Sequence, residues 1–176
     1  NYEDRNGSGT VTITPAPVTI TVNDGSKVYG ASDPAFSGIV NGLIGSDSIG
    51  TVSYSRTGTD ENVGTYPDVL TASYTANSNY TVTVNNGDFA ITPATGAALD
   101  ITGYSGVYDG AAHSITVSGL ITGDTISYSL DGSIWTAEKP EFTNVTTGTA
   151  VYVRVTNPNY EDRNGSGTVT ITPAPV

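Results

Sequence analysis

The chain of 176 residues contains no cysteine, no methionine and a single histidine. Without cysteine it has no disulfide framework, zinc–thiolate cluster or thiol nucleophile, and one histidine cannot supply a two-histidine metal site. No apolar run approaches the roughly 18 residues of a membrane span. No leader or sorting tail is recognisable. We therefore expect a mature soluble fragment that does not insert into a membrane.

Basic residues are also scarce, with 6 Lys plus Arg against 17 Asp plus Glu and a net charge of -11. Such a field repels phosphate backbones and anionic headgroups, which argues against binding to nucleic acid or to a membrane surface. The apolar fraction of 36% is modest. It is dominated by Val, Ile and Tyr, which together with the abundant Thr favour strands, so we expect a β fold with a thin core.

One long sequence occurs twice. Residues 1–18, NYEDRNGSGTVTITPAPV, recur without change as residues 159–176. Identity over this length indicates one period of a tandem array plus an overlap. Residues 1–14 are therefore interpreted as the C-terminal strand of a preceding repeat.

A weaker repeat divides the period into two halves. The tetrapeptide Ile-Thr-Pro-Ala occurs at residues 13–16, 91–94 and 171–174. Because proline ends ladder pairing and stiffens the backbone, we place domain boundaries there and predict domains 15–94 and 95–176. Three other pairs of landmarks keep nearly the same offset: Val28-Tyr29 with Val107-Tyr108, Gly42-Leu43 with Gly119-Leu120, and Asn79-Tyr80 with Asn159-Tyr160.

Apolar residues alternate with Thr or other polar residues along residues 18–22, 80–84, 151–155 and 169–171, which predicts strands with one buried face. Dipeptides that favour tight hairpins with positive φ are frequent along the chain: Asp24-Gly25, Asn86-Gly87, Asp109-Gly110, Asp131-Gly132 and Asn164-Gly165. Residues 33–50 do not alternate, and we expect a short helical turn there. The predicted class is all-β, with two tandem immunoglobulin-like β-sandwich domains of about 80 residues each.

The landmarks resemble those of a known family. Lys27-Val28-Tyr29-Gly30, Asp33-Pro34 and Gly42-Leu43 make the first domain similar to the YGX-type MBG domain of bacterial surface proteins. Val107-Tyr108-Asp109-Gly110, Gly119-Leu120 and Asn159-Tyr160 make the second domain similar to its YDG-type relative. The resemblance implies β-rich repeats, arranged in tandem in large adhesin-like proteins of the bacterial cell surface, without enzyme activity.

Catalytic constellations are weak. His113 has no accompanying nucleophile motif, so we interpret it as an ordinary polar residue at a strand edge. The acids Glu138 and Glu141 could form a pair, but a glycosidase needs a groove that so small a sandwich is not expected to provide. We predict that the protein is not an enzyme and has no cofactor.

Calcium remains an alternative, because acidic side chains beside Gly or Ser in turns supply the oxygen ligands that this cation takes. No EF-hand or nonapeptide spacing is present, and Asp-Gly is foremost a turn signal. The candidate ligands are Asp24, Asp47, Asp109, Asp124 and Asp131.

Exposed aromatic rings could bind a glycan or a host or matrix protein, and the candidates are Trp135, Tyr104, Tyr108 and Tyr128. A lone Trp in such a domain also fits the core. Lys27 and Lys139 are candidates for an intramolecular crosslink to an Asn, although no crosslink motif accompanies them and a plain surface role fits both.

We therefore predict an extracellular, non-enzymatic stalk or spacer repeat of a bacterial cell-surface adhesin, whose partners are neighbouring repeats. The alternative is a glycan- or protein-binding module that uses exposed aromatics. A third hypothesis concerns residues 1–14, which could exchange with the identical strand of another molecule.

Overall fold

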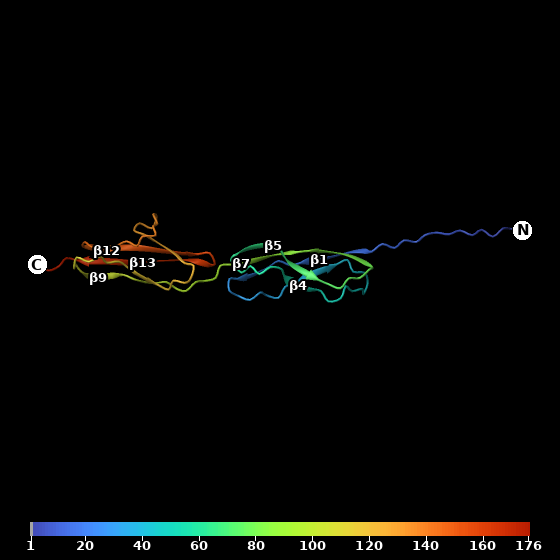
Figure 1. Cartoon of the computed structure of the whole chain (residues 1–176), viewed down its shortest axis with the longest axis horizontal. Helices are drawn as coiled ribbons and strands as arrows, with labels where there is room; N and C mark the ends of the chain where they lie inside the picture. Colours follow the sequence, from blue (N-terminus) through green and yellow to red (C-terminus); the bar gives the residue numbers. More distant parts are fainter. Residues whose placement is uncertain (1) are drawn as a thin grey trace. The chain divides into compact units, whose positions relative to one another are not determined.

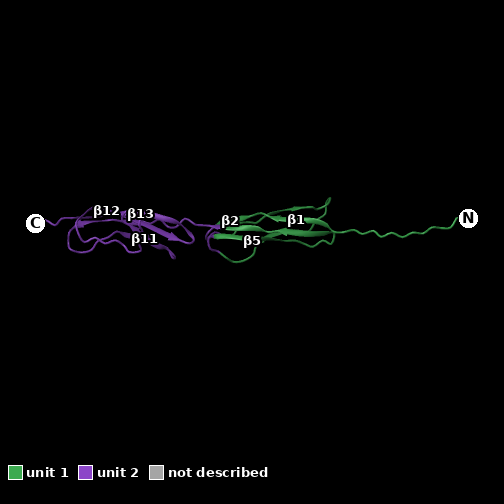
Figure 2. Cartoon of the chain, turned by 90° about the horizontal axis from the view of Figure 1, so that it is seen from above, with its two compact units in different colours: residues 1–27, 32–60, 64–90 green, residues 28–31, 61–63, 91–176 purple. Residues whose placement is uncertain are grey.

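The computed structural model describes residues 2–176, and its regular structure is entirely β (Figure 1). The described residues contain no helix, and therefore none long and apolar enough to cross a membrane. Two compact units are formed (Figure 2). Unit 1 contains the chain up to residue 27, residues 32–60 and residues 64–90; unit 2 contains residues 28–31, 61–63 and 91–176.

The first half of the chain folds into two sheets. Its strands are β1 (Ala16–Val22), β2 (Gly25–Val28), β3 (Gly38–Asn41), β4 (Ser53–Arg56), β5 (Gly64–Ser73), β6 (Tyr80–Asn85) and β7 (Gly87–Thr92). One sheet has the order β3-β1-β6 and the other β2-β7-β5-β4. Val18, Ile20, Ile49 and Tyr80 form one buried cluster, because alternate residues of β1 face inward.

The second half repeats this plan. Its strands are β8 (Asp100–Thr102), β9 (Tyr104–Val107), β10 (Thr116–Ser118), β11 (Thr125–Ser129), β12 (Thr146–Asn157) and β13 (Tyr160–Thr172). The sheets have the orders β10-β8 and β11-β12-β13-β9. The core is built by alternate residues of the central strands β12 and β13, joined by Ile115 and Tyr128: Val151, Val153, Val155, Val169 and Ile171. Two sheets that face each other across one core in each half confirm the predicted immunoglobulin-like β-sandwich.

In both halves the first strand is interrupted and changes sheets. β1 leads into β2 through two residues, and β8 leads into β9 through Gly103. In each half a part of this strand pairs in parallel with a strand near the end of the half: β1 pairs with β6, and β9 pairs with β13. We call β1–β2 and β8–β9 the opening strands, and β6–β7 and β13 the closing strands.

Two local predictions were wrong. Residues 33–50 contain β3 and a turn that the N–H of Asp47 closes on the carbonyl of Ile44, but no helical turn. Of the five turn dipeptides, only those at residues 109–110 and 131–132 have a glycine with positive φ. Gly25 and Gly87 lie where a strand changes sheets, and Gly165 lies within β13. A Cβ on Gly87 would lie 2.8 Å from the carbonyl oxygen of Asn23, so close approach of two strands explains this glycine better than turn geometry.

The segment before the first sandwich has a different structure. Residues 2–15 belong to no strand, and their side chains are exposed. Of the predicted strand 1–14, Asn1 lies outside the described residues. In this chain the segment therefore has no sheet partner of its own, although its sequence is identical to that of β13.

Candidate functional site: the ends of the closing strands

Each closing strand begins with the same turn. The side-chain oxygen of Asn77 accepts a hydrogen bond of 3.0 Å from the N–H of Asn79. The side-chain oxygen of Asn157 accepts a bond of 3.0 Å from the N–H of Asn159. Such Asx-turns hold the chain at a defined angle, so the Asn-x-Asn-Tyr sequence starts the closing strand in both halves.

The same turn also holds the Ile-Thr-Pro-Ala motif. The N–H of Ala16 donates to the carbonyl of Asn79 at 2.9 Å, and the N–H of Ala94 donates to the carbonyl of Asn159 at 3.1 Å. Proline cannot donate such a bond, and in both copies the alanine after it provides the first N–H. The alanine of the motif that precedes each opening strand is thus hydrogen-bonded to the residue just before the closing strand.

At the opposite end of each half, the tyrosine of the Val-Tyr landmark, here called the tyrosine motif, is hydrogen-bonded to the threonine of the next Ile-Thr-Pro-Ala. The N–H of Tyr29 donates to the carbonyl of Thr92 at 2.9 Å, and the N–H of Tyr108 donates to the carbonyl of Thr172 at 2.8 Å. A glycine of positive φ follows each motif: Gly30 at 81° and Gly110 at 80°. Opening and closing strands are therefore joined at both ends by motifs that the sequence repeats.

The glycine of each Gly-Leu landmark makes a third close contact with an opening strand. Gly42 and Gly119 have φ values of 102° and 85°, in the region that glycine favours. A Cβ on Gly42 would clash with the carbonyl oxygen of Pro17, and one on Gly119 with that of Ala98. Both glycines therefore let the chain pass close to the backbone at the start of an opening strand, within β1 in one half and just before β8 in the other.

A four-residue turn follows each Gly-Leu. The N–H of Asp47 donates to the carbonyl of Ile44, and the N–H of Asp124 donates to the carbonyl of Ile121, each at 3.1 Å. The two aspartates therefore occupy equivalent positions.

In the first half this aspartate holds the closing strand through a phenol. The hydroxyl of Tyr80 donates to Oδ2 of Asp47 at 2.7 Å and accepts from the N–H of Ile44 at 3.1 Å. The hydrogen bond to Asp47 raises the pKa of Tyr80 above its ordinary value. Tyr80 is the first residue of β6, so this contact fixes the strand at its start.

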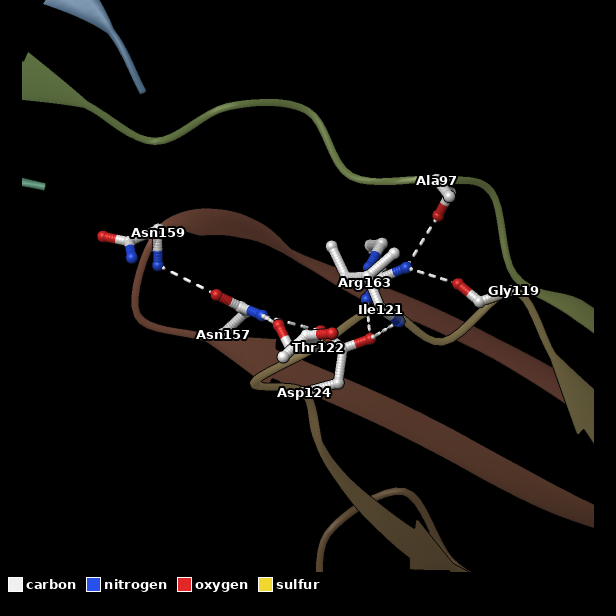
Figure 3. A network of polar contacts seen from close by, with 8 residues as sticks. All are labelled: Ala97, Gly119, Ile121, Thr122, Asp124, Asn157, Asn159 and Arg163. Carbon is white, nitrogen blue, oxygen red and sulfur yellow. Dashed lines mark hydrogen bonds and ion pairs between the residues drawn. The ribbon is translucent and has the colours of Figure 1, made fainter. Parts of the chain in front are cut away.

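In the second half the equivalent aspartate is the centre of a larger network (Figure 3). The carboxylate of Asp124 accepts from the N–H of Ile121 at 2.7 Å, from Nδ2 of Asn157 at 3.0 Å and from Nη2 of Arg163 on β13. Burial raises the pKa of this carboxyl, but the hydrogen bonds from Ile121, Asn157 and Arg163 and the charge of Arg163 outweigh burial, so the pKa lies below its usual range.

Arg163 connects three segments of unit 2. Its Nη1 donates to the carbonyls of Ala97 at 2.8 Å and Gly119 at 2.9 Å, while Nη2 pairs with Asp124. The side chains of Arg163 and Asp124 are only 10% and 3% exposed. A buried, hydrogen-bonded pair of this kind is strongly destabilised when one partner is removed. The pair was not predicted from the sequence, although Arg163 stands out as a charged residue in a strand whose fully buried side chains, Val169 and Ile171, are apolar.

The five calcium candidates all accept hydrogen bonds from within the chain. Among residues 2–176 no group of three or more His, Asp or Glu side chains is placed to hold a metal ion. Asp24 accepts from the N–H of Asp88, Asp47 from the hydroxyl of Tyr80, and Asp109 from the N–H of Ala111. Asp124 accepts from the donors of the network described above, and Asp131 accepts from the N–H groups of Ser133 and Ile134.

Two of the candidate aromatics are engaged within unit 2. The ring of Tyr104 stacks on His113, with centroids 3.8 Å apart, and its hydroxyl lies 3.1 Å from Nε2 of His113. Nε2 also lies 2.9 Å from Oδ1 of Asp109, and this hydrogen bond lowers the pKa of Asp109. Tyr128 is buried in the core.

Trp135 is half-buried beneath a cation: the guanidinium carbon of Arg154 lies 4.6 Å from the ring centroid. Tyr108 is exposed. The structure thus does not bring the four candidate aromatics together on one exposed face.

Tyr128 and Thr136 exchange backbone hydrogen bonds of 2.8 and 2.9 Å, which close a hairpin over residues 128–136. The exposed large apolar residues of this hairpin are Leu130 and Ile134, and they line a cavity of about 280 Å³ together with Tyr128 and Pro140.

The two candidate lysines differ. Nζ of Lys27 lies 2.8 Å from Oδ1 of Asp33, and its side chain is 5% exposed. Asp33 also pairs with Nε of Arg56 at 2.8 Å. The hydrogen bond from Lys27, together with Arg56, lowers the pKa of Asp33 despite partial burial. Lys139 is exposed, as are the two glutamates considered for catalysis, Glu138 and Glu141.

Comparison with known proteins supports part of the family prediction. Residues 18–90 match the family model of the MBG domain (YGX type). Residues 18–90 are therefore similar to the MBG domain (YGX type), and the YDG assignment of the second half remains a prediction. No curated protein matches the chain.

Among solved structures, the four immunoglobulin domains of Sidekick-1 are similar to this chain with a TM-score of 0.44 and 11% identity. That alignment covers 93% of this chain and 51% of the other, so this chain spans about half the length of that structure. The fibronectin(III)-like modules of CbhA from Clostridium thermocellum align with a TM-score of 0.32 and 11% identity, over 77% of this chain and 85% of the other.

Proposed function

We propose that this chain is a non-enzymatic stalk repeat of a bacterial cell-surface adhesin, which holds a distal binding region away from the cell. The similarity of residues 18–90 to the MBG domain (YGX type) is consistent with a repeat domain of surface proteins. The extracellular location and the adhesin belong to this proposal.

The observation that carries the proposal is the repeated sequence at the end of β13. β13 ends at Thr172, and Pro173 to Val176 repeat Pro15 to Val18, which lead into β1. In an array of such periods, only a proline separates β13 of one copy from the alanine that starts β1 of the next. A joint so short, with φ fixed by proline, limits bending between copies.

The closing strands suit a role under tension. β9 is parallel to β13, with Val169 opposite Tyr104 and Thr172 opposite Val107. Because the strands are parallel, the chain before β9 and the chain after β13 leave this ladder at opposite ends. Pulling the two ends apart therefore shears all its hydrogen bonds together instead of opening them one by one.

Solution scattering on arrays of one, two and three periods would test the stalk. A stiff array gains a constant increment in maximum dimension with each 158-residue period. A collapsed array would instead follow the compact scaling, in which the radius grows as roughly the 0.38 power of length, and would contradict the proposal.

A second candidate function is binding of a protein partner at the 128–136 hairpin. Ile134 is 71% exposed and Leu130 53% exposed, and both line the cavity of this hairpin. A panel of glycans and extracellular-matrix proteins should be probed with the chain, with Ile134→Asp and with Trp135→Ala. A hit lost only in Ile134→Asp would favour a protein contact, a hit lost in Trp135→Ala would favour a ring-stacked ligand, and no hit would leave the stalk alone.

A further inference from the structure

The segment 2–14 is a second copy of a strand that the fold requires. Tyr2 to Thr14 have the same sequence as β13, Tyr160 to Thr172, residue for residue. β13 lies at the centre of its sheet, between β12 and β9, and pairs with both. The segment therefore contains every side chain that the central strand of unit 2 uses.

The same residues have opposite environments in the two copies. Val11 and Ile13 are 87% and 90% exposed, whereas their counterparts Val169 and Ile171 are 0% and 1% exposed. Two large aliphatic side chains held in water have a strong tendency to be buried. Their burial requires a sandwich with a free position beside β12 and β9.

The segment also contains the residues that make the other specific contacts of β13. Arg5 corresponds to Arg163, which pairs with Asp124. Gly7 and Gly9 correspond to Gly165 and Gly167. A Cβ on Gly165 or Gly167 would clash with Ile101 or Ile115, so few strand sequences fit this position, and the segment has the glycines it needs.

We propose that residues 2–14 are a donor strand, which completes unit 2 of a second copy of this chain by occupying the β13 position. In an array of such periods the sequence of residues 2–14 would itself be the β13 of the preceding period, so the exchange concerns a separate molecule. In a separate molecule, the position opens only when that molecule's own β13 is displaced or absent. The unaltered chain gains nothing by the exchange, because an identical strand already fills the position, and it should stay at its monomer mass of 18.1 kDa. The inference goes beyond the stalk role, which does not depend on it.

The test uses the full-length chain with β13 disabled by Val169→Asp and Ile171→Asp, and follows mass by light scattering across a range of concentrations. Trp135 is the single tryptophan and packs on Arg154 of β12, so its emission reports whether unit 2 is folded. We expect this variant to associate to about twice 18.1 kDa or more as concentration rises, with native-like Trp135 emission.

The matched controls change the donor. A chain with Val11→Asp and Ile13→Asp alone should remain a folded monomer, and a chain with all four substitutions should neither associate nor regain the Trp135 signal. A synthetic peptide of residues 1–14 should restore that signal in the four-substitution chain, whereas a scrambled peptide should not. The proposal is overturned if the β13-disabled chain stays monomeric, with or without native Trp135 emission, or if it associates no differently from the four-substitution chain.

Discussion

The backbone N–H of Tyr108 donates a hydrogen bond of 2.8 Å to the carbonyl oxygen of Thr172, and this bond joins the end of the opening strand to the end of the closing strand. Tyr29 and Thr92 make the same bond at 2.9 Å in the first half. The tyrosine motif and the Ile-Thr-Pro-Ala motif, about 65 residues apart in each half, are thus two parts of one contact between the end of the opening strand and the end of the closing strand.

Replacing Tyr108 by proline tests that contact, because proline removes the N–H. We expect Tyr108→Pro to lower the free energy of unfolding by about 1–3 kcal/mol, the cost of leaving a hydrogen-bonding group without its partner. Tyr108→Ala keeps the N–H and is the control for loss of the ring. Urea denaturation followed by Trp135 emission measures both, and equal losses in the two variants would contradict a role for this bond.

The buried ion pair of unit 2 gives a prediction with an internal control. Arg163→Met leaves the carboxylate of Asp124 buried without its cation, and we expect a loss of about 3–5 kcal/mol in unfolding free energy. Arg5→Met makes the same change in the identical but exposed segment and should leave stability within about 0.5 kcal/mol. Thermal melting of the two variants separates these outcomes. Similar melting temperatures would show that the Arg163 network does not stabilise unit 2.

Close packing predicts a further contrast between the two copies. A Cβ on Gly167 would lie 2.8 Å from Cγ2 of Ile115, whereas a Cβ on Gly9 would have no atom within 4 Å. Gly167→Ala should therefore destabilise the chain by about 1–3 kcal/mol through overpacking, while Gly9→Ala should be neutral. Chemical denaturation is again the measurement, and an unchanged midpoint for Gly167→Ala would mean that Ile115 gives way at little cost.

Stability should fall in acid. The carboxyls of Asp33, Asp109, Asp124 and Asp131 have pKa values below the ordinary one in the folded chain. The unfolded chain, with aspartate pKa values of about 3.9, then binds more protons in this range than the folded chain. Their contribution is therefore complete above the unfolded value and is lost as the pH falls below about 4 through the folded values.

Asp131→Asn identifies one source of this dependence. The N–H groups of Ile134 and Ser133, and the hydroxyl of Ser129, lower the pKa of Asp131. Asparagine keeps an acceptor oxygen for the turn but does not titrate, so the urea midpoint of Asp131→Asn should change less between pH 5 and pH 3 than that of the unaltered chain. Parallel curves would exclude a contribution from Asp131.

Calcium should have little effect on stability. The carboxylates of the five candidate aspartates, from Asp24 to Asp131, already accept hydrogen bonds within the chain. We expect the melting temperature to change by less than about 1 °C between excess chelator and millimolar calcium, because a cation that bound the folded chain well below that concentration would raise it by mass action. A larger rise in melting temperature would show that calcium binds the folded chain, and the aspartate substitution that abolishes this rise would identify the ligand.

The landmarks could be found from the sequence because they recur, but their contacts could not. Offsets near 80 residues placed Gly42 with Gly119 and Tyr29 with Tyr108, and the structure gives each pair the same backbone role. What the offsets did not show is that Asp47 and Asp124 are equivalent yet hold the closing strand through different partners, a tyrosine in one half and an arginine in the other. Partners that lie far apart in the chain come together only when the sheets form.

Three of the five turn dipeptides were wrongly predicted to have a glycine with positive φ, for a related physical reason. Asp-Gly and Asn-Gly favour positive φ, but glycine also allows close approach, and the sequence does not distinguish the two uses. Gly132 has a φ of 75° in a turn, while Gly165 lies inside β13 against Ile101.

The sequence by itself determined the all-β class and the recurrence of residues 1–18 and of the Ile-Thr-Pro-Ala motif, because alternation and identity are properties of the chain alone. It could not determine what one stretch of sequence does in two places. Val169 is buried and Val11 is exposed within identical surroundings in sequence, because only residues 160–172 find β12 and β9 beside them. Strand structure depends on its neighbours in the sheet, and those neighbours are provided only by the tertiary structure.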